Sequence, residues 1–317
     1  MKKPLIWLLC AALWMSMCAC TRAGAEETPE PAREDGTPPA AAPEAETARS
    51  MDMELTSGDG LIRISVHAAA DEIPSAMPVL KLRPRTITPD MARRMAEGAF
   101  GTAELDAACA RARTLAAGMG LGEWRFTAAA ADMTDSGGGW QIELTGRPVY
   151  EGYPVNWQAA AVDQSLYPER LTIHTANGGG LIDLYYTSPM EAVETVEQAA
   201  PLKTWEEIEP AAVKAMQGWT YETLIPGYAS EKAWWDGIGV EQVDAAVDID
   251  AICVGYTRVK GDAGEYYLIP AVTFPGRLTV KGVIPGVHET PMDLLFDGGA
   301  DYNAALTLDL RSGAVIQ

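Results

Sequence analysis

The sequence predicts an α+β protein in which two helix-plus-antiparallel-sheet units follow a disordered N-terminal tether. Three observations indicate this class. A short apolar leader precedes a segment rich in Ala, Pro and Glu. Beyond that segment, apolar residues at helical spacing give way to strict alternation, and this succession occurs twice. The roughly 260 residues after the tether are enough for two domains with their own cores, which we place at 58–200 and 201–317.

The leader at 1–19 has the composition of a secretory signal peptide. Two lysines precede an apolar run over 5–17, which is shorter than the roughly 20 residues needed to cross a membrane. Ala19 supplies a small residue for cleavage immediately before Cys20. This order resembles the bacterial lipobox, and the resemblance implies a thioether-linked diacylglycerol on Cys20, a palmitate-type anchor on the outer side of the cell membrane. An ordinary cleaved signal that leaves a free cysteine and an uncleaved anchor are the alternatives.

The segment at 20–57 is expected to be a disordered tether. It is rich in Ala, Pro, Glu and Thr and has almost no large apolar residue. Such a composition cannot bury enough surface to offset the loss of chain entropy on folding. Its prolines stiffen it, so it would hold the folded part away from the membrane.

The cysteines indicate a fold that is stabilised by its core. Of the five cysteines, Cys10 and Cys18 leave with the signal and Cys20 takes the lipid. Only Cys109 and Cys253 then remain, and a single pair is not a disulfide framework. We expect both to be core residues without a disulfide between them, and the sequence leaves open whether they are free thiols.

The charge of the chain restricts its partners. It carries 24 basic and 44 acidic residues, for a net charge of −20. Phosphate backbones and anionic lipid surfaces repel such a chain, so nucleic acid is not an expected partner. Solubility near a charged envelope explains the acidity, and binding of cationic ligands or of loosely held calcium by acidic loops is the alternative.

The first unit opens with a strand, "LIRISVH", in which apolar and polar residues alternate over 61–67. After a Pro-marked bend, 79–85 is expected to be its partner strand. A helix then begins in "TPDMARRMAEGAF", where Thr88 is placed to cap and Pro89 takes the first helical position.

A second helix and a set of strands complete the first unit. The helix carries one apolar stripe: Leu105, Ala108, Cys109, Ala112, Leu115, Ala116 and Met119. Thr102 is its expected cap. From 124 to 186, alternating segments separated by Gly-rich turns predict an antiparallel meander, including a strand in "VNWQAAAV" at 155–162. His174 is expected to face solvent.

The second cycle is expected to begin with a helix in "SPMEAVETVEQAA", in which Ser188 and Glu191 form a capping box. Its expected buried side is Met190, Val193 and Val196. Another helix starts at Pro210, which would break any helix that ran through from Thr204. Strands follow at 241–259, 265–274, 277–282 and 304–316. In the first, Val243, Val247, Ile249 and Cys253 share the core face.

Part of this pattern resembles a known family. "TGRPVYEGYPVNW" and "LTIHTANGGGLIDLYYTSPME" are similar to the meander of exported PepSY-like domains, and "YYLIPAVTF" and "LTLDLRSGAVI" look like that family's closing strands. The start, from "LIRISVHA" through "LKLRPRTITPD", resembles uncharacterised Gram-positive lipoproteins. The resemblance implies cystatin-like units outside the cytoplasm that bind or hold back exported partners. No catalytic residue can be carried over from it.

The residues offer no catalytic or metal-binding motif. G-x-S-x-G, S-x-x-K, H-E-x-x-H and a Gly-rich phosphate loop are all absent. The three histidines, His67, His174 and His288, lie in separate elements and are expected at the surface, so neither a metal nor a cofactor is expected. "FDGGADYN" offers Asp297, Asp301 and Asn303 as oxygen donors, but its spacing favours a Gly-rich turn over a calcium loop.

One segment is a candidate binding surface. "IPGYASEKAWWDGIG" places Tyr228, Trp234 and Trp235 in a Gly-flanked stretch of weak periodicity. Aromatic side chains on loops stack on sugars or anchor protein partners. The alternative is a lid packed over the second sheet. Exposed, adjacent tryptophans would favour binding, and buried ones would exclude it.

Two functions are therefore compatible with the sequence. The first is a non-catalytic, lipid-anchored surface protein that binds or regulates an exported protein, a peptide or a cell-wall component. The second is a cell-envelope hydrolase that uses an unrecognised carboxylate pair, because glycoside hydrolysis needs only two acids held roughly 5 to 10 Å apart.

Overall fold

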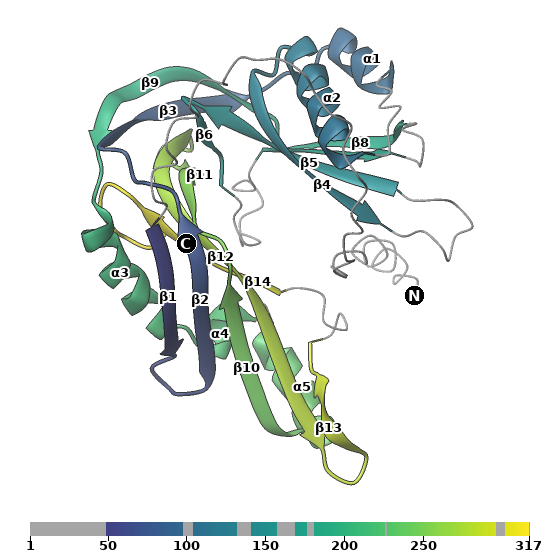
Figure 1. Cartoon of the computed structure of the whole chain (residues 1–317), viewed down its shortest axis with the longest axis vertical. Helices are drawn as coiled ribbons and strands as arrows, with labels where there is room; N and C mark the ends of the chain where they lie inside the picture. Colours follow the sequence, from purple (N-terminus) through teal and green to yellow (C-terminus); the bar gives the residue numbers. More distant parts are fainter. Residues whose placement is uncertain are drawn as a thin grey trace, which may run out of the picture.

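A computed structural model describes residues 49–97, 104–131, 141–156, 169–175, 181–225, 227–295 and 302–316. The chain forms two β-sheets, and helices lie against each of them (Figure 1). The predicted α+β class is thus confirmed. Within these ranges no helix is long and apolar enough to cross a membrane. The predicted signal peptide, Ala19 and Cys20 lie outside the described residues.

The larger sheet has nine strands, and its longest strand, the 19-residue β12, pairs with five others. The main strand order is β1 (Arg49–Thr56), β2 (Ile62–Ala70), β10 (Glu241–Ile249), β12 (Tyr266–Ile284), β3 (Ala76–Pro84) and β9 (Met190–Pro201). β12 also pairs with β11 (Cys253–Lys260), β13 (His288–Asp293) and β14 (Tyr302–Asp309). β2 and β10 run parallel, and the other pairs in this sheet are antiparallel.

The smaller sheet is an antiparallel meander of five strands, as the sequence predicts for this region. Its strands are β4 (Glu123–Ala131), β5 (Gln141–Tyr150), β6 (Tyr153–Pro154), β7 (Arg170–Thr175) and β8 (Leu181–Thr187). Most of the strand expected at 155–162 lies outside the described residues. This sheet and its two helices are inserted in the chain between β3 and β9 of the larger sheet.

Local signals placed the two helices of this insertion correctly. α1 (Pro89–Glu97) begins at the predicted proline, and the Met91 amide donates to the Thr88 hydroxyl at 3.2 Å. α2 (Leu105–Gly118) buries Ala108, Cys109, Ala112 and Ala116 against the sheet. Leu105, the first helical residue, is exposed, so the buried stripe begins one turn later than predicted. The expected cap Thr102 lies outside the described residues.

The segment predicted as the helix "SPMEAVETVEQAA" is instead strand β9. Met190 is buried as expected, but Val193 and Val196 are 45% and 53% exposed. Ser188 has a φ of 49°, outside the extended conformation of a helix cap. The β-branched residues of the segment suit a strand, and the antiparallel partner β3, distant in sequence, overrides the local helix signal.

A helix runs through Pro210, which is a second error of the sequence prediction. α3 (Trp205–Gln217) begins with a capping box of Thr204 and Glu207 and contains the proline. A proline inside a helix removes its own N–H bond and crowds the carbonyl four residues earlier, and here the apolar face of α3 offsets this cost by burying Ile208 and Met216. α4 (Tyr221–Leu224) and α5 (Tyr228–Ile238) pack over the same core.

The sequence predicts two units that meet at residue 200, but the chain does not divide there. β1, β2, β3 and β9 from the first half share the nine-stranded sheet with all strands of the second half. The predicted pairing of β2 with 79–85 is also wrong, because β2 lies between β1 and β10. The tether prediction is wrong for 49–56, where alternate residues Met51, Met53 and Leu55 pack on the core and form β1.

The segment expected as one strand at 241–259 is two strands, β10 and β11. Val247 and Ile249 are buried as predicted, whereas Val243 is exposed. A register shift between Glu241 and Asp244, with Gln242 at a φ of 52°, turns this end of the strand.

A third apolar cluster joins the two sheets. It consists of Met77, Leu80, Leu82, Val155, Met190, Tyr256 and Leu268. Beside it, the Asn156 amide nitrogen Nδ2 donates to the Cys253 carbonyl at 2.9 Å, and its backbone N–H donates to the Tyr256 carbonyl at 2.7 Å. The segment after β6 is thereby held against β11.

Candidate functional site

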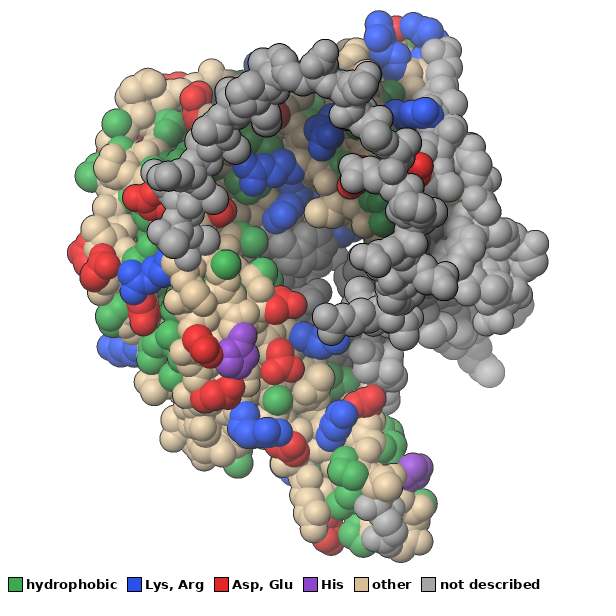
Figure 2. Space-filling view, in the orientation of Figure 1, with side chains coloured by type: hydrophobic (Ala, Val, Ile, Leu, Met, Phe, Trp, Pro, Cys, Tyr) green, Lys and Arg blue, Asp and Glu red, His purple; other side chains and the backbone are tan. Residues whose placement is uncertain are grey.

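A hollow of about 560 Å³ opens where β3 ends and the inserted sheet begins. We call it the arginine hollow. It is lined by Arg83, Pro84, Arg85, Thr86, Thr88, Met91, Met119, Gly120 and Glu191. Figure 2 shows several Lys and Arg side chains in the upper part of one face of the protein. Basic side chains in a recess stand out in a chain with a net charge of −20.

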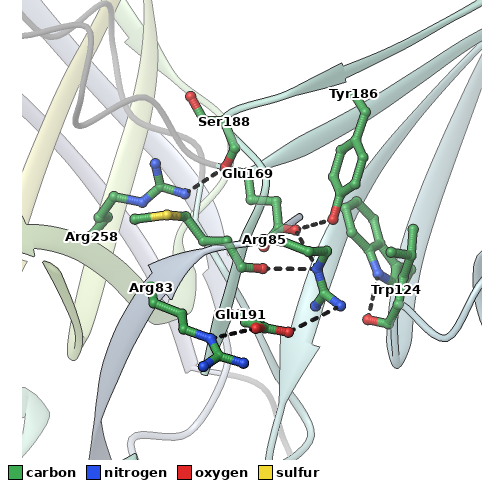
Figure 3. Close-up of polar contacts among 10 residues, drawn as sticks. Arg83, Arg85, Trp124, Glu169, Tyr186, Ser188, Glu191 and Arg258 are labelled. Atoms are coloured by element: carbon green, nitrogen blue, oxygen red, sulfur yellow. Dashed lines mark hydrogen bonds and ion pairs between the residues drawn. The ribbon is translucent and has the colours of Figure 1, made fainter. Parts of the chain in front are cut away.

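Two guanidinium groups flank one carboxylate in the arginine hollow (Figure 3). Arg83 lies directly opposite Glu191 across the β3–β9 pair, and its Nε donates to Glu191 Oε1 at 2.6 Å. Arg85 approaches from the other side, with Nη1 3.8 Å from Glu191 Oε2 and Nε donating to the Met190 carbonyl at 3.2 Å. The Arg83 side chain is 67% exposed, whereas that of Arg85 is mostly buried.

Glu169 lies behind Arg85 and is 2% exposed. Its Oε1 accepts a hydrogen bond from the Tyr186 hydroxyl and lies 3.9 Å from Arg85 Nε. Burial raises the pKa of Glu169 to about 7, against the opposing effects of the Tyr186 hydrogen bond and the charges of Arg85 and Arg258. Burial, followed by the neighbouring Glu169 charge, also raises the pKa of Tyr186. The carboxyl group of Glu169 therefore titrates near neutral pH.

The surroundings of Glu169 connect both sheets. Arg258, on β11, is buried and donates from Nη2 to the Ser188 carbonyl at 3.1 Å. Burial lowers the pKa of Arg258, and the charge of Glu169 opposes this shift. On the smaller sheet, Trp124 packs edge-on to Tyr186 with ring centroids 5.9 Å apart. Side chains from β4 and β8 thus meet residues from β9 and β11 around one buried carboxyl group.

The arrangement is suited to binding an anion. Arg83, Arg85 and Arg258 together carry one more charge than Glu191 and Glu169 neutralise when both are ionised. The Arg85 guanidinium contacts two carboxyl groups, Glu169 at 3.9 Å and Glu191 at 3.8 Å. In the part of the chain that the structure describes, no group of His, Cys, Asp and Glu side chains is arranged to hold a metal ion.

The predicted aromatic surface is mainly part of the core. Tyr228, Trp234 and Trp235 all lie on α5, which the sequence analysis treated as a loop. Trp235 is buried and its Nε1 donates to the Leu294 carbonyl at 3.0 Å. Tyr228 stacks on Tyr221 with ring centroids 5.4 Å apart, and Trp234 is half-buried against the same cluster. The exposed tryptophan pair is therefore not formed, and the alternative of a lid over the sheet fits the structure.

The histidines occupy three separate strands. His67 is exposed on β2, with Nδ1 2.6 Å from Asp52 Oδ1 and Nε2 3.0 Å from Glu54 Oε1. His174 is half-buried on β7, where Nε2 lies 3.3 Å from Glu143 Oε2, so it faces solvent only in part. His288 is exposed on β13.

Two further sets of predicted residues have simple outcomes. Cys109 is buried and Cys253 is half-buried, both are free thiols, and burial raises the pKa of each. The carboxylates Asp297 and Asp301, considered for calcium, lie outside the described residues.

Sequence reasoning did not identify the arginine hollow. The sequence pattern predicts a helix cap at Glu191 and places Glu169 in the predicted strands of the first unit. The one local signal was "RPR" at 83–85, a pair of arginines at the end of a strand in a strongly acidic chain.

Comparisons with known proteins assign no family. No family model and no curated protein matches the chain. Among solved structures, the chain is similar to an uncharacterised protein from Eubacterium rectale ATCC 33656, with 11% identity and a TM-score of 0.46. The match covers 84% of this chain and 93% of that one.

Proposed function

We propose that this protein is a non-catalytic surface lipoprotein that binds an extended, basic segment of an exported protein along strand β9. In this proposal a lipid on Cys20 anchors the chain to the outer side of the cell membrane. The inserted helices and five-stranded sheet constitute a PepSY-like, cystatin-like unit. The partner is held, and thereby regulated, rather than chemically changed.

The observation that supports this function is the open edge of β9. This 12-residue strand is the last in the order of the large sheet and, among the described residues, pairs only with β3. Every residue from 192 to 199 is exposed. An unpaired strand edge binds an extended peptide by adding it as a further strand, with main-chain hydrogen bonds providing affinity.

The side chains of β9 favour a basic partner. Glu194 and Glu197 are exposed along the strand, and Val193 and Val196, each directly before one of them, add apolar surface. Two copies of this edge would bring like charges together, which opposes pairing of the protein with itself. A segment that carries both Lys or Arg and apolar residues complements these side chains, and the net charge of −20 attracts it over a longer range.

Site-specific photo-crosslinking tests this function. A benzophenone amino acid replaces Val196 in the full chain within its own cells, and Val287, which is 77% exposed in the turn between β12 and β13, carries it in the control. We expect a discrete cross-linked protein from position 196 and none of the same size from position 287. Absence of a product at 196, or identical products at both positions, would contradict the proposal.

The lipid anchor is tested separately. Cys20→Ser is expected to release the chain from the membrane fraction or to leave an unprocessed precursor, as immunoblotting of fractions would show. Normal processing and membrane retention of this variant would exclude the lipobox interpretation.

A hydrolase remains the second candidate, because one observation favours it. Glu169 and Glu191 lie on either side of Arg85, and burial raises the pKa of Glu169 to about 7, which suits a general acid. The Arg85 guanidinium contacts both carboxylates, however, where a glycosidase needs room for the sugar and water. Release of soluble fragments from wall polymer by the purified protein, and its loss in Glu169→Gln, would favour the hydrolase over the binding protein.

A further inference from the structure

We infer that the arginine hollow binds a singly charged oxyanion, a carboxylate or a phosphodiester, that carries an apolar substituent. This site stands apart from the partner proposed for β9. It rests on the donors, the charge and the apolar walls of the hollow itself.

The hollow presents unused hydrogen-bond donors. Among the described residues, the Arg83 guanidinium has one acceptor, Glu191, which is bound through Nε, so both Nη groups remain available. Arg85 is engaged through Nε and Nη1, which leaves Nη2. In Figure 3 the two guanidinium groups flank Glu191 from opposite sides. Guanidinium N–H groups form paired hydrogen bonds with the two oxygens of a carboxylate or a phosphodiester.

The charge of the hollow matches a monoanion. Three arginines, Arg83, Arg85 and the buried Arg258 behind them, against two glutamates, Glu191 and Glu169, leave an excess of one positive charge even when both glutamates are ionised, and a carboxylate or phosphodiester neutralises it. Glu191 competes with the ligand for the charge of the same two guanidinium groups, because it accepts from Arg83 Nε and approaches Arg85 Nη1. Removing its charge should therefore tighten binding, whereas removing the Arg83 charge should weaken it.

The remaining walls explain the apolar substituent. Met91 and Met119 come from α1 and from the end of α2, and Pro84 closes the wall beside them. Methionine side chains adapt to apolar groups of varied shape. The volume of about 560 Å³ lies within the roughly 300 to 1,000 Å³ of small-molecule sites, so the hollow has room for more than the charged group alone.

The test is an NMR titration of the full chain in neutral detergent, observing the arginine Nε–H signals. The probes are acetate, butyrate and diethyl phosphate, with butyramide as the uncharged analogue of butyrate. Arg63 is the internal control, since it is 65% exposed and has a single carboxylate partner, Asp244, at 2.7 Å. Saturable shifts at Arg83 and Arg85 but not at Arg63 are expected, with acetate binding up to roughly fifteenfold more weakly than butyrate because it lacks two methylene groups. The order of butyrate and diethyl phosphate identifies which oxyanion the site prefers.

Two variants make the result decisive. Arg83→Gln should weaken binding of the preferred probe at least fivefold, and Glu191→Gln should strengthen it. A misfolded protein cannot mimic tighter binding, so the second variant guards against structural damage. Equal shifts at Arg63, shifts that do not saturate with any anion, or equally strong binding of butyramide would overturn the inference.

Discussion

The hydroxyl of Tyr186 donates a hydrogen bond to Glu169, a carboxyl group buried where the two sheets meet. The bond favours the ionised form of Glu169, as does the charge of Arg85, yet burial outweighs both and keeps its pKa near 7. Ionisation of Glu169 near neutral pH therefore places a negative charge in the interior of the protein.

Glu169 should make the stability of the protein depend on pH. Its pKa rises from 4.5 in an exposed chain to about 7 in the folded protein. The folded state therefore holds the proton more tightly, so the contribution of Glu169 to stability is fully present below pH 4.5 and is lost as the pH rises through 7. At 1.36 kcal/mol per pKa unit, the loss is on the order of 3 kcal/mol.

Urea unfolding at pH 5 and pH 8 measures this loss. We expect the free energy of unfolding to fall with pH in the unmodified protein by clearly more than in Glu169→Gln, because glutamine carries no proton to lose. Glu222→Gln, a change at an exposed position on α4, is the matched control and should behave like the unmodified protein. The same pH profile in Glu169→Gln and in the unmodified protein would show that Glu169 does not titrate in this range.

A second prediction concerns the junction of the sheets at Gly255. A Cβ atom at this position would overlap the Pro154 carbonyl and lie 2.6 Å from Asn156 Oδ1. Gly255→Ala should therefore destabilise the protein by about 1 to 3 kcal/mol, the usual cost of overpacking. Thermal unfolding with circular dichroism would detect a lower Tm.

Gly237→Ala is the control for that substitution. Gly237 lies within α5, and nothing lies within 4 Å of where its Cβ would be. Alanine is favoured over glycine inside a helix, so this variant should be stabilised by about 0.5 to 1 kcal/mol. Destabilisation of both variants by similar amounts would mean that the crowding at Gly255 is not the cause.

His67 should titrate above its ordinary range. Hydrogen bonds with Glu54 and then Asp52 raise its pKa from 6.5. Because the folded-state pKa is raised, the contribution of His67 to stability is present below pH 6.5 and is lost as the pH rises through the shifted value. NMR titration of the imidazole should show the raised pKa, and Glu54→Gln should lower it toward 6.5. An unchanged pKa in that variant would mean that Glu54 does not hold the imidazolium.

Sequence reasoning succeeded where structure is encoded locally. Thr88 and Pro89 start α1 through contacts within one turn, and the alternation of Ile62, Ile64 and Val66 identifies a buried strand face without knowledge of its partner. The antiparallel pairing of the smaller sheet also follows from alternating segments that lie close together in the sequence.

It failed where distant segments decide the outcome. The capping pattern at 188–191 is a valid local helix signal, but pairing with β3 makes the segment a strand. The candidate site depends on the same pairing, because Arg83 and Glu191 are 108 residues apart in the chain. Likewise, nothing local distinguishes the buried Glu169 from the many exposed carboxylates of an acidic protein.

β12 pairs with five other strands and comes late in the sequence, so its position determines when the large sheet can be completed. A chain emerging from its N-terminus makes β2 and β3 early, but they are separated in the sheet by β10 and β12, which come from the last third of the sequence. Loop closure over such distances is slow, so high contact order should make formation of the large sheet the late step. A chain truncated before Tyr266 would lack the strand that lies between β3 and β10, so each of them would lose one of its two partners and the large sheet would be divided. The inserted unit over 89–187, by contrast, can form its own local contacts before that strand exists.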